Sequence, residues 1–382
     1  MDRSQAIDFV HKLLRLLLER KGSDLFITAG FPPAIKVNGR VTPVSETPLT
    51  PAHTQEIASA VMNDKQMAQF DAHKEANFAI SLPGEARFRT SAFVQRDSVG
   101  LVMRPIPTVI PSFEELHLPP ILRDIAMTKL GLVLFVGGTG TGKSTSLAAM
   151  VDYRNEHDYG HIITIEDPIE FLHRHKHCIV TQREVGVDTE SYAEALKNTL
   201  RQAPDVILIG EIRERETMEH GIAFAETGHL CLSTLHANNT NQAMDRIINF
   251  FPEDRRPQLL MDLSFNLKAV VSQRLIPRQD GQGRIPAVEV MINTPLMSDL
   301  LLKGKFHEIK DLMARSNELG MQTFDQSLFN LFEAGHISFE QALKNADSIN
   351  DLRLRIKLES QRAKREDIFK VAERFTLQED PE

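Results

Sequence analysis

The sequence contains two cysteines among 382 residues. Cys178 and Cys231 are too few for a disulfide framework or a four-cysteine zinc site, so we expect a chain that folds in a reducing cytosol. No apolar run approaches the ~18 residues that a membrane-spanning helix needs. Charged residues at Arg15, Glu19 and Arg20 interrupt the leucines near the N-terminus, which argues against a secretory signal.

The chain also has fewer basic than acidic residues. The chain has 44 Lys and Arg residues against 52 Asp and Glu residues, a formal net charge of −8. Dedicated nucleic-acid binders usually carry a basic balance, so we expect no nucleic-acid partner. The 42% hydrophobic and 25% charged fractions are those of a globular protein, and the length predicts two or three domains.

A phosphate-loop motif is the most informative feature that is present. The apolar run 132–136 predicts a buried strand, and Leu147, Met150 and Val151 recur behind it at helical spacing. Between them, backbone N–H groups of a glycine loop and a helix N-terminus would hold phosphate oxygens. The pattern G-x-x-x-x-G-K-[ST] is filled by Gly137, Gly138, Thr139, Gly140, Thr141, Gly142, Lys143, Ser144 and Thr145. Lys143 would contact the β- and γ-phosphates of a nucleotide triphosphate, and Ser144 would ligate Mg²⁺.

The chain up to about residue 104 reads as a small antiparallel sheet with helices. Residues 4–21 predict an amphipathic helix, and Asn38-Gly39 predicts a hairpin turn between short strands. A proline-rich stretch over 105–120 then predicts a linker.

After residue 121 the pattern changes to that of a parallel α/β fold. Short continuous apolar runs at 132–136, 162–165, 206–209 and 230–234 alternate with helix-like segments, as in a parallel sheet covered on both faces. From about Asp254 we expect mostly helix. The charged segment 350–382 predicts a solvated or partner-facing helical tail.

Two acids follow predicted parallel strands, where such sheets place ligand sites. Glu166 ends the run 162–165, and a carboxylate there could orient an attacking water. Glu211 follows the run 206–209 and would hold Mg²⁺. Gly210 stands where many phosphate-loop proteins carry Asp, so Glu211 would reach the metal alone, through a water.

Histidines offer two further candidates. His229 and His236 bracket the run 230–234, and we expect His229 to sense the γ-phosphate, against the alternative of a structural strand histidine. The alternating histidines of the segment 173–178 would share one face of a strand and could bind metal. The interleaved Arg174 and Lys176 favour a basic edge instead.

In this order, the clusters resemble those of the secretion ATPases, and most closely those of the type IV pilus retraction ATPases, the PilT-like and PilU-like proteins. The phosphate loop is similar to the family's Walker A motif. The stretches 165–170, 209–213 and 227–236 are similar to its Asp box, Walker B motif and His box. The resemblance extends over roughly residues 4–345.

The resemblance implies a homo-hexameric ring at the cytoplasmic face of the inner membrane, acting on an inner-membrane pilus platform protein. It implies a PAS-like domain (1–104), a linker (105–120), a RecA-like ATPase domain (121–348) with a helical C-terminal part, and a charged tail (349–382). ATP would lie between subunits, and N-terminal arginines would complete the site from a neighbour. The candidates for that role are Arg89, Arg96 and Arg104. Asp97 occupies a position where the PilT-like pattern has arginine, so either Arg96, one place earlier, substitutes or that arginine is lost.

One departure indicates the subtype. After Thr294-Pro295, PilT-like motors carry two arginines, whereas this chain has Ser298 and Leu302. With the longer tail, this resembles the PilU-like accessory retraction ATPases, partners of a PilT-like retraction ATPase, and we expect the run 300–302 to offer an apolar face to a partner. The alternatives are a main PilT-like motor, a ring helicase or translocase outside pili, and a non-hydrolysing partner ring.

Overall fold

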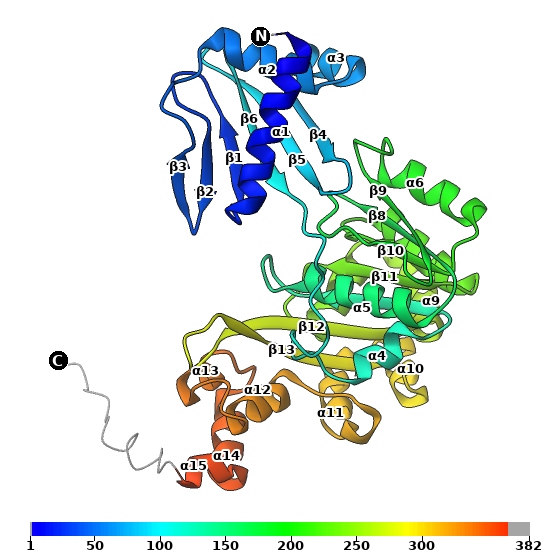
Figure 1. Ribbon diagram of the computed structural model, residues 1–382. Coiled ribbons are helices and arrows are strands. Elements are labelled where there is room, and N and C mark those ends of the chain that lie inside the picture. The colour runs from blue at the N-terminus through cyan, green and yellow to red at the C-terminus, as the bar shows by residue number, and fades with distance from the viewer. Residues whose placement is uncertain (1, 366–382) are drawn as a thin grey trace, which may run out of the picture. The chain divides into compact units, whose positions relative to one another are not determined.

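The structure, a computed structural model, describes residues 2–365, which form two compact units (Figure 1). Unit 1 contains the chain up to Val109 and two returning segments, Ile169–Leu172 and Arg183–Ser191. Unit 2 contains the rest. No helix among the described residues is both long and apolar enough to cross a membrane.

Unit 1 is a six-stranded antiparallel sheet packed against helices, in the order β3-β2-β1-β6-β5-β4. The hairpin expected at Asn38-Gly39 is confirmed: both residues have positive φ, +49° and +79°, as a tight two-residue turn requires. Helix α1 buries Val10, Leu14 and Leu17 in the core of the unit. The elements are α1 (Arg3–Glu19), β1 (Asp24–Ile27), β2 (Ala34–Val37), β3 (Arg40–Pro43), α2 (Pro51–Val61), α3 (Asp64–His73), β4 (Glu75–Leu82), β5 (Ala86–Gln95) and β6 (Ser98–Pro105).

Unit 2 is built on a seven-stranded sheet in the order β13-β12-β7-β11-β10-β8-β9. The four predicted strands are confirmed and pair in parallel, and β12 extends them in parallel beside β7. The strands are β7 (Gly131–Val136), β8 (His161–Glu166), β9 (Ile179–Glu184), β10 (Val206–Ile209), β11 (Leu230–Leu235), β12 (Leu267–Pro277) and β13 (Arg284–Ile292).

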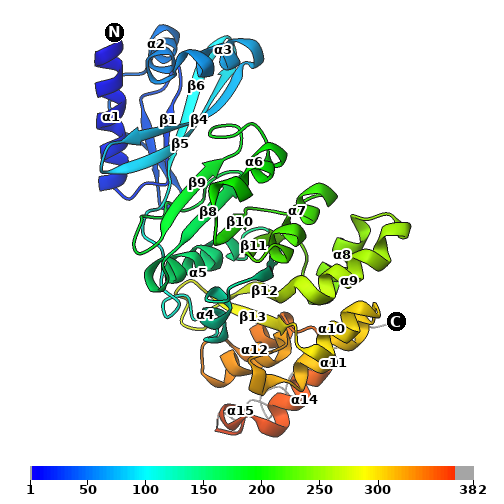
Figure 2. The same cartoon turned by 90° about the vertical axis from the view of Figure 1, so that its right-hand side faces the viewer.

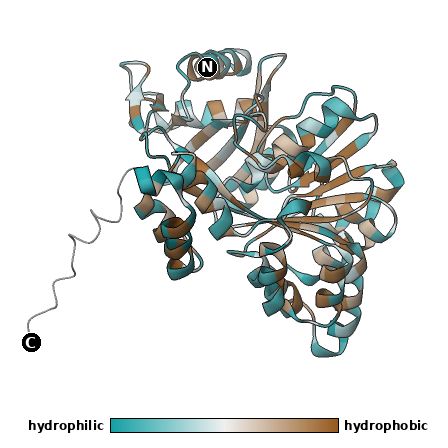
Figure 3. Cartoon of the chain, turned by 90° about the horizontal axis from the view of Figure 1, so that it is seen from below, coloured by the Kyte–Doolittle hydropathy of each residue, from teal (hydrophilic) through white to brown (hydrophobic). Residues whose placement is uncertain are grey.

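Helices cover both faces of this sheet (Figure 2). Helix α5 connects β7 to β8 toward one edge of the sheet, whereas α7 to α9 connect β10, β11 and β12 back toward the other edge. Because each of these crossovers is right-handed, α5 and the group α7 to α9 lie on opposite faces of the sheet. Apolar residues follow the strands of the sheet (Figure 3). The helices are α4 (Ile121–Ala126), α5 (Lys143–His157), α6 (Tyr192–Thr199), α7 (Arg215–Glu226), α8 (Thr240–Asn249), α9 (Arg256–Asn266), α10 (Pro295–Leu302), α11 (Ile309–Ala314), α12 (Phe324–Glu333), α13 (Phe339–Lys344), α14 (Ile349–Glu359) and α15 (Gln361–Arg365).

The expectation of mostly helix after Asp254 is wrong for residues 267–292, which form the long hairpin β12–β13. Both strands are almost continuously buried. Because both faces of the strands are buried, their sequences show no regular alternation of polar and apolar residues from which a strand could be recognised.

Two further expectations about the C-terminal part are also wrong. In α10, Leu300 and Leu301 are buried, α10 packs against α9, and only Leu302 of the run 300–302 is exposed. In α14, Leu352 and Ile356 are buried in a cluster with α12, so the charged segment up to Arg365 is part of unit 2. The remainder of the expected tail, 366–382, lies outside the described residues.

Candidate active site at the carboxyl edge of the sheet

The phosphate loop joins β7 to α5, as expected from the motif. Gly142 has φ +87° and precedes the helix without a side-chain cap, which leaves the first N–H groups of α5 available for an anion. A Cβ on Gly137 would lie 2.5 Å from the Thr141 hydroxyl oxygen, and one on Gly142 would lie 2.8 Å from Gln273 Nε2. Both positions therefore require glycine.

Lys143 is turned into the loop and is buried, at 8% exposure. Its Nζ donates to the carbonyl oxygens of Gly137 and Gly138, both at 2.8 Å. Burial lowers the pKa of Lys143, and the nearby Glu211 carboxylate opposes that effect. The ammonium thus stabilises the loop in the absence of phosphate, in addition to any role toward a nucleotide.

Gln273 on β12 hydrogen-bonds to the phosphate loop. It is buried, its Nε2 donates to the Thr141 carbonyl oxygen at 2.8 Å, and its Oε1 accepts from the Ser146 hydroxyl at 2.8 Å. One amide therefore ties the loop to the first turn of α5. Sequence reasoning missed Gln273 because β12 was not recognised as a strand beside the loop.

Glu166 and Glu211 are brought to the edge at which the phosphate loop begins. The register pairs Ile165 with Ile209 and Val136 with Leu235, and Ile209 pairs with Ser233, so these strands end within two residues of one another. Glu166 Oε1 accepts from the Thr164 hydroxyl at 2.6 Å and from Gln182 Nε2 at 3.2 Å. These two donors fix the carboxylate's orientation, and neither was singled out from the sequence.

Glu211 is held between two basic side chains. Arg213 Nε donates to its Oε2 at 2.7 Å, and His236 Nε2 lies 3.1 Å from its Oε1. Burial and the charge of Lys143 lower the pKa of His236, whereas Glu211 raises it. The first and largest of these effects favours a neutral imidazole.

His229 is not brought to this edge, and its expected role in sensing a γ-phosphate stays a prediction. It precedes β11, its carbonyl accepts from the Gly131 N–H, and Gly131 begins β7. The six residues of β11 separate it from His236, which corresponds to about 23 Å of extended strand. Its Nδ1 instead lies near Thr227 Oγ1 and the Phe224 carbonyl. His236 is the histidine that reaches Glu211.

The alternating histidines do not share the face of a strand either. The segment 173–178 is a loop, and β9 begins only at Ile179. Burial lowers the pKa of His173 to about 4. His177 stacks on Tyr159 with ring centroids 5.0 Å apart. Within residues 2–365 no group of three His, Cys, Asp or Glu side chains is placed to hold a metal ion.

Two of the three candidate arginines are paired within unit 1. Arg104 binds Asp24, with Nη2 and Nε 2.6 and 2.8 Å from Oδ1, and Arg89 lies 3.7 Å from Glu170. Arg96 is exposed at the turn between β5 and β6 with φ +47°, and no described residue forms an ion pair with it. Their role toward a nucleotide of a neighbour stays a prediction.

The oxygen donors of the site fit a magnesium ion. The Ser144 hydroxyl is exposed in the first turn of α5, and hydroxyl and carboxylate oxygens are ligands that Mg²⁺ prefers. Because Arg213 and His236 occupy both oxygens of Glu211, a water-mediated contact requires less rearrangement than direct ligation.

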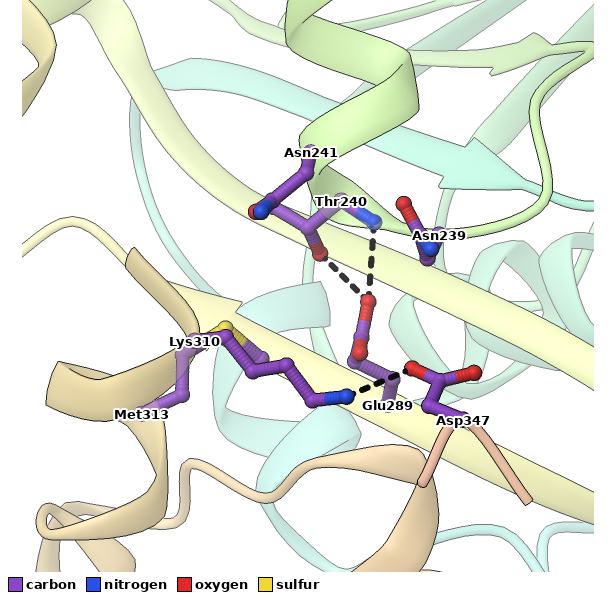
Figure 4. A pocket seen from close by; sticks show the side chains of 7 residues that line it. All are labelled: Asn239, Thr240, Asn241, Glu289, Lys310, Met313 and Asp347. Carbon is purple, nitrogen blue, oxygen red and sulfur yellow. Dashed lines mark hydrogen bonds and ion pairs between the residues drawn. The ribbon is translucent and has the colours of Figure 1, made fainter. Parts of the chain in front are cut away.

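Polar residues that line a pocket of about 320 Å³ anchor the loop that follows His236 (Figure 4). Glu289 Oε1 accepts from the Thr240 N–H and hydroxyl, both at 2.8 Å, and from Ser272 Oγ at 3.1 Å. Lys310 Nζ binds Asp347 at 3.0 Å. Burial raises the pKa of Glu289, although the Thr240 and Ser272 donors oppose this. This network fixes the start of α8 beside the candidate site.

Known proteins are similar to the chain over most of its length. Residues 1–321 match the family model described as Type II/IV secretion system protein. The type IV pilus ATPase PilU of Pseudomonas aeruginosa is 64% identical over 350 residues, 92% of each chain. The type IV pilus retraction ATPase PilT of the same organism is 41% identical over 337 residues, 88% of this chain and 98% of the relative. The crystal structure of the pilus retraction motor PilT with bound ADP matches with a TM-score of 0.82 and 39% identity, covering 90% of this chain and 98% of that one.

Proposed function

Because the chain belongs to the type II/IV secretion system ATPase family, we propose that it is the motor of a hexameric ring that retracts type IV pili, as an accessory to a PilT-like ring. The chain is an ATPase of the pilus retraction class by its relatives. The observation that carries the proposal is the assembly of phosphate loop, Glu166 and Glu211 at one edge of a parallel sheet in a chain 64% identical to a PilU.

In the proposed reaction, the loop amides and Lys143 hold the phosphates of ATP. Glu166, oriented by Thr164 and Gln182, orients the water that attacks the γ-phosphate. Ser144 directly and Glu211 through a water would hold Mg²⁺, and the ion would supply positive charge to the phosphate oxygens. His236, whose neutral form is favoured by burial, contacts the Glu211 carboxylate through its Nε2.

An arginine from a neighbouring subunit completes the site. Such an arginine is worth ~10³–10⁵ in rate in other phosphate-loop enzymes. Arg89, Arg96 and Arg104 are the candidates, and the pairs Arg104–Asp24 and Arg89–Glu170 hold two of them in defined positions before any neighbour binds. Turnover would then depend on ring formation.

The accessory role follows from α10. Ser298 donates its hydroxyl to the Ser264 carbonyl oxygen at 2.7 Å, and Leu302 is exposed. The two positive charges of PilT-like motors are therefore absent from this surface. We infer that the ring requires a PilT-like partner to act on the inner-membrane platform protein.

The proposal is tested by measuring pilus retraction in cells that lack every other retraction ATPase, with and without this protein. We expect no retraction from this chain alone and increased retraction force or frequency when a PilT-like motor is restored. The Lys143→Ala variant serves as the control for ATP turnover. Retraction supported by this chain alone would refute the accessory role but not the ATPase function.

A further inference from the structure

Gly210 leaves a gap in the acidic edge of the site. Many phosphate-loop proteins carry a metal-binding Asp at the end of the corresponding strand, whereas this chain has no side chain there. The backbone of Gly210 is firmly placed: its N–H donates to the Ile165 carbonyl at 2.8 Å, and its own carbonyl accepts from Thr234 Oγ1 at 2.6 Å. Another part of the chain must therefore fill the space.

The Tyr192 hydroxyl fills it. A Cβ built on Gly210 would lie 2.9 Å from the Tyr192 hydroxyl oxygen and 3.2 Å from the Cα of Glu166. Tyr192 is the first residue of α6, and its hydroxyl lies beside Gly210, which follows β10, and near Glu166, which ends β8. The phenol oxygen thus lies on the strand ends that carry Glu166 and Glu211.

The surroundings keep the phenol protonated. Burial raises the pKa of Tyr192, and the carboxylates of Asp167, Glu166 and Glu211 raise it further, while Arg213 lowers it. A protonated phenol among carboxylates is a hydrogen-bond donor. Donors fixed next to reacting groups lower barriers because they need no reorganisation during the reaction.

We propose that Tyr192 is a positioning residue of the ATPase site, whose hydroxyl takes the place of the missing Asp side chain and orients the water or metal shell between Glu166 and Glu211. The inference rests on the proposed function and adds a residue to the same site. It also explains why position 210 holds glycine, since any side chain would displace the hydroxyl.

The test compares Tyr192→Phe, Gly210→Ala and the double variant with the wild-type full-length chain. Tyr192→Phe removes only the oxygen, so the fold should be retained. We expect kcat for ATP to fall about tenfold, the size of one hydrogen bond that acts in the transition state, and KM for ATP to stay within about twofold. The exposed Tyr159 provides the matched control, because Tyr159→Phe removes a hydroxyl from a residue that the site does not use.

Stability gives a second readout that does not require turnover. Gly210→Ala should lower the melting temperature of the nucleotide-free protein in the wild-type background and lower it less in the Tyr192→Phe background, because the 2.9 Å contact is with the oxygen. Equal effects in both backgrounds, or a Tyr192→Phe kcat within twofold of wild type, would overturn the inference. Absence of ATP turnover in the wild type would instead refute the proposed function, and the stability comparison would still decide where the hydroxyl lies.

Discussion

Replacing Lys143 with alanine separates what the phosphate-loop motif predicts from what the structure adds. The motif alone places the lysine toward phosphate and predicts a melting temperature that hardly moves without nucleotide. In the structure its ammonium donates to the carbonyls of Gly137 and Gly138 and is buried. Lys143→Ala should therefore destabilise the nucleotide-free protein as well as remove ATP turnover.

The size of the effect follows from the two lost hydrogen bonds. Leaving a buried carbonyl unpaired costs ~1–3 kcal/mol. The Gly137 carbonyl is buried, whereas the Gly138 carbonyl is part-buried and water can replace the lysine there. Relief of the cost of burying an ammonium, seen in the lowered pKa of Lys143, offsets part of the loss. We expect a net loss of about 2 kcal/mol, which lowers the melting temperature by roughly 4–6 °C in a unit of this size.

The assay is thermal or denaturant unfolding without nucleotide, followed by ATP turnover of the same samples. Lys197→Ala, an exposed lysine on α6, controls for the loss of one positive charge. An unchanged melting temperature would refute the structural role assigned to the lysine. A folded variant with wild-type turnover would refute the phosphate-loop assignment itself.

The remaining predictions concern catalysis, assembly, pH and the C-terminus. Glu166→Gln should bind ATP normally but turn it over ~10²–10⁴-fold more slowly; normal turnover, measured apart from affinity, would assign the role to another acid. Mixing Lys143→Ala with Arg104→Ala subunits should restore some activity if Arg104 acts between subunits, and no rescue at any ratio would move the test to Arg89 and Arg96. Because the pKa of Glu289 is raised above its usual 4.5, the folded state keeps a proton that the unfolded state loses, so the free energy of unfolding should fall as pH rises above 4.5. Glu289→Gln should lack this fall, and equal pH dependence of unfolding in the variant and the wild type would contradict the prediction. Removing residues after Arg365 should weaken co-purification with a PilT-like partner and leave turnover unchanged, whereas removal from residue 350 should also destabilise unit 2, because Leu352 and Ile356 are buried.

The sequence by itself determined the features that depend on local pattern. Continuous apolar runs predicted four strands of the parallel sheet, Asn38-Gly39 predicted the β2–β3 hairpin of unit 1, and the motif predicted the phosphate loop. Glu166 and Glu211 were found because acids that follow parallel strands must meet at one edge. Each of these inferences needs only neighbours along the chain or a rule of sheet topology.

Tertiary structure decided everything that depends on which distant segments lie together. The hairpin β12–β13 was missed because a fully buried strand has no alternation to read, and with it went Gln273, which reaches the loop from 132 residues beyond Thr141. His229 precedes β11 and His236 follows it, and the parallel pairing with β7 places His236 beside Glu211 and His229 on the far edge. The Tyr192 hydroxyl lies beside Gly210 and the Cα of Glu166 because the first residue of α6 meets the ends of two strands there, a contact that no spacing along the chain encodes.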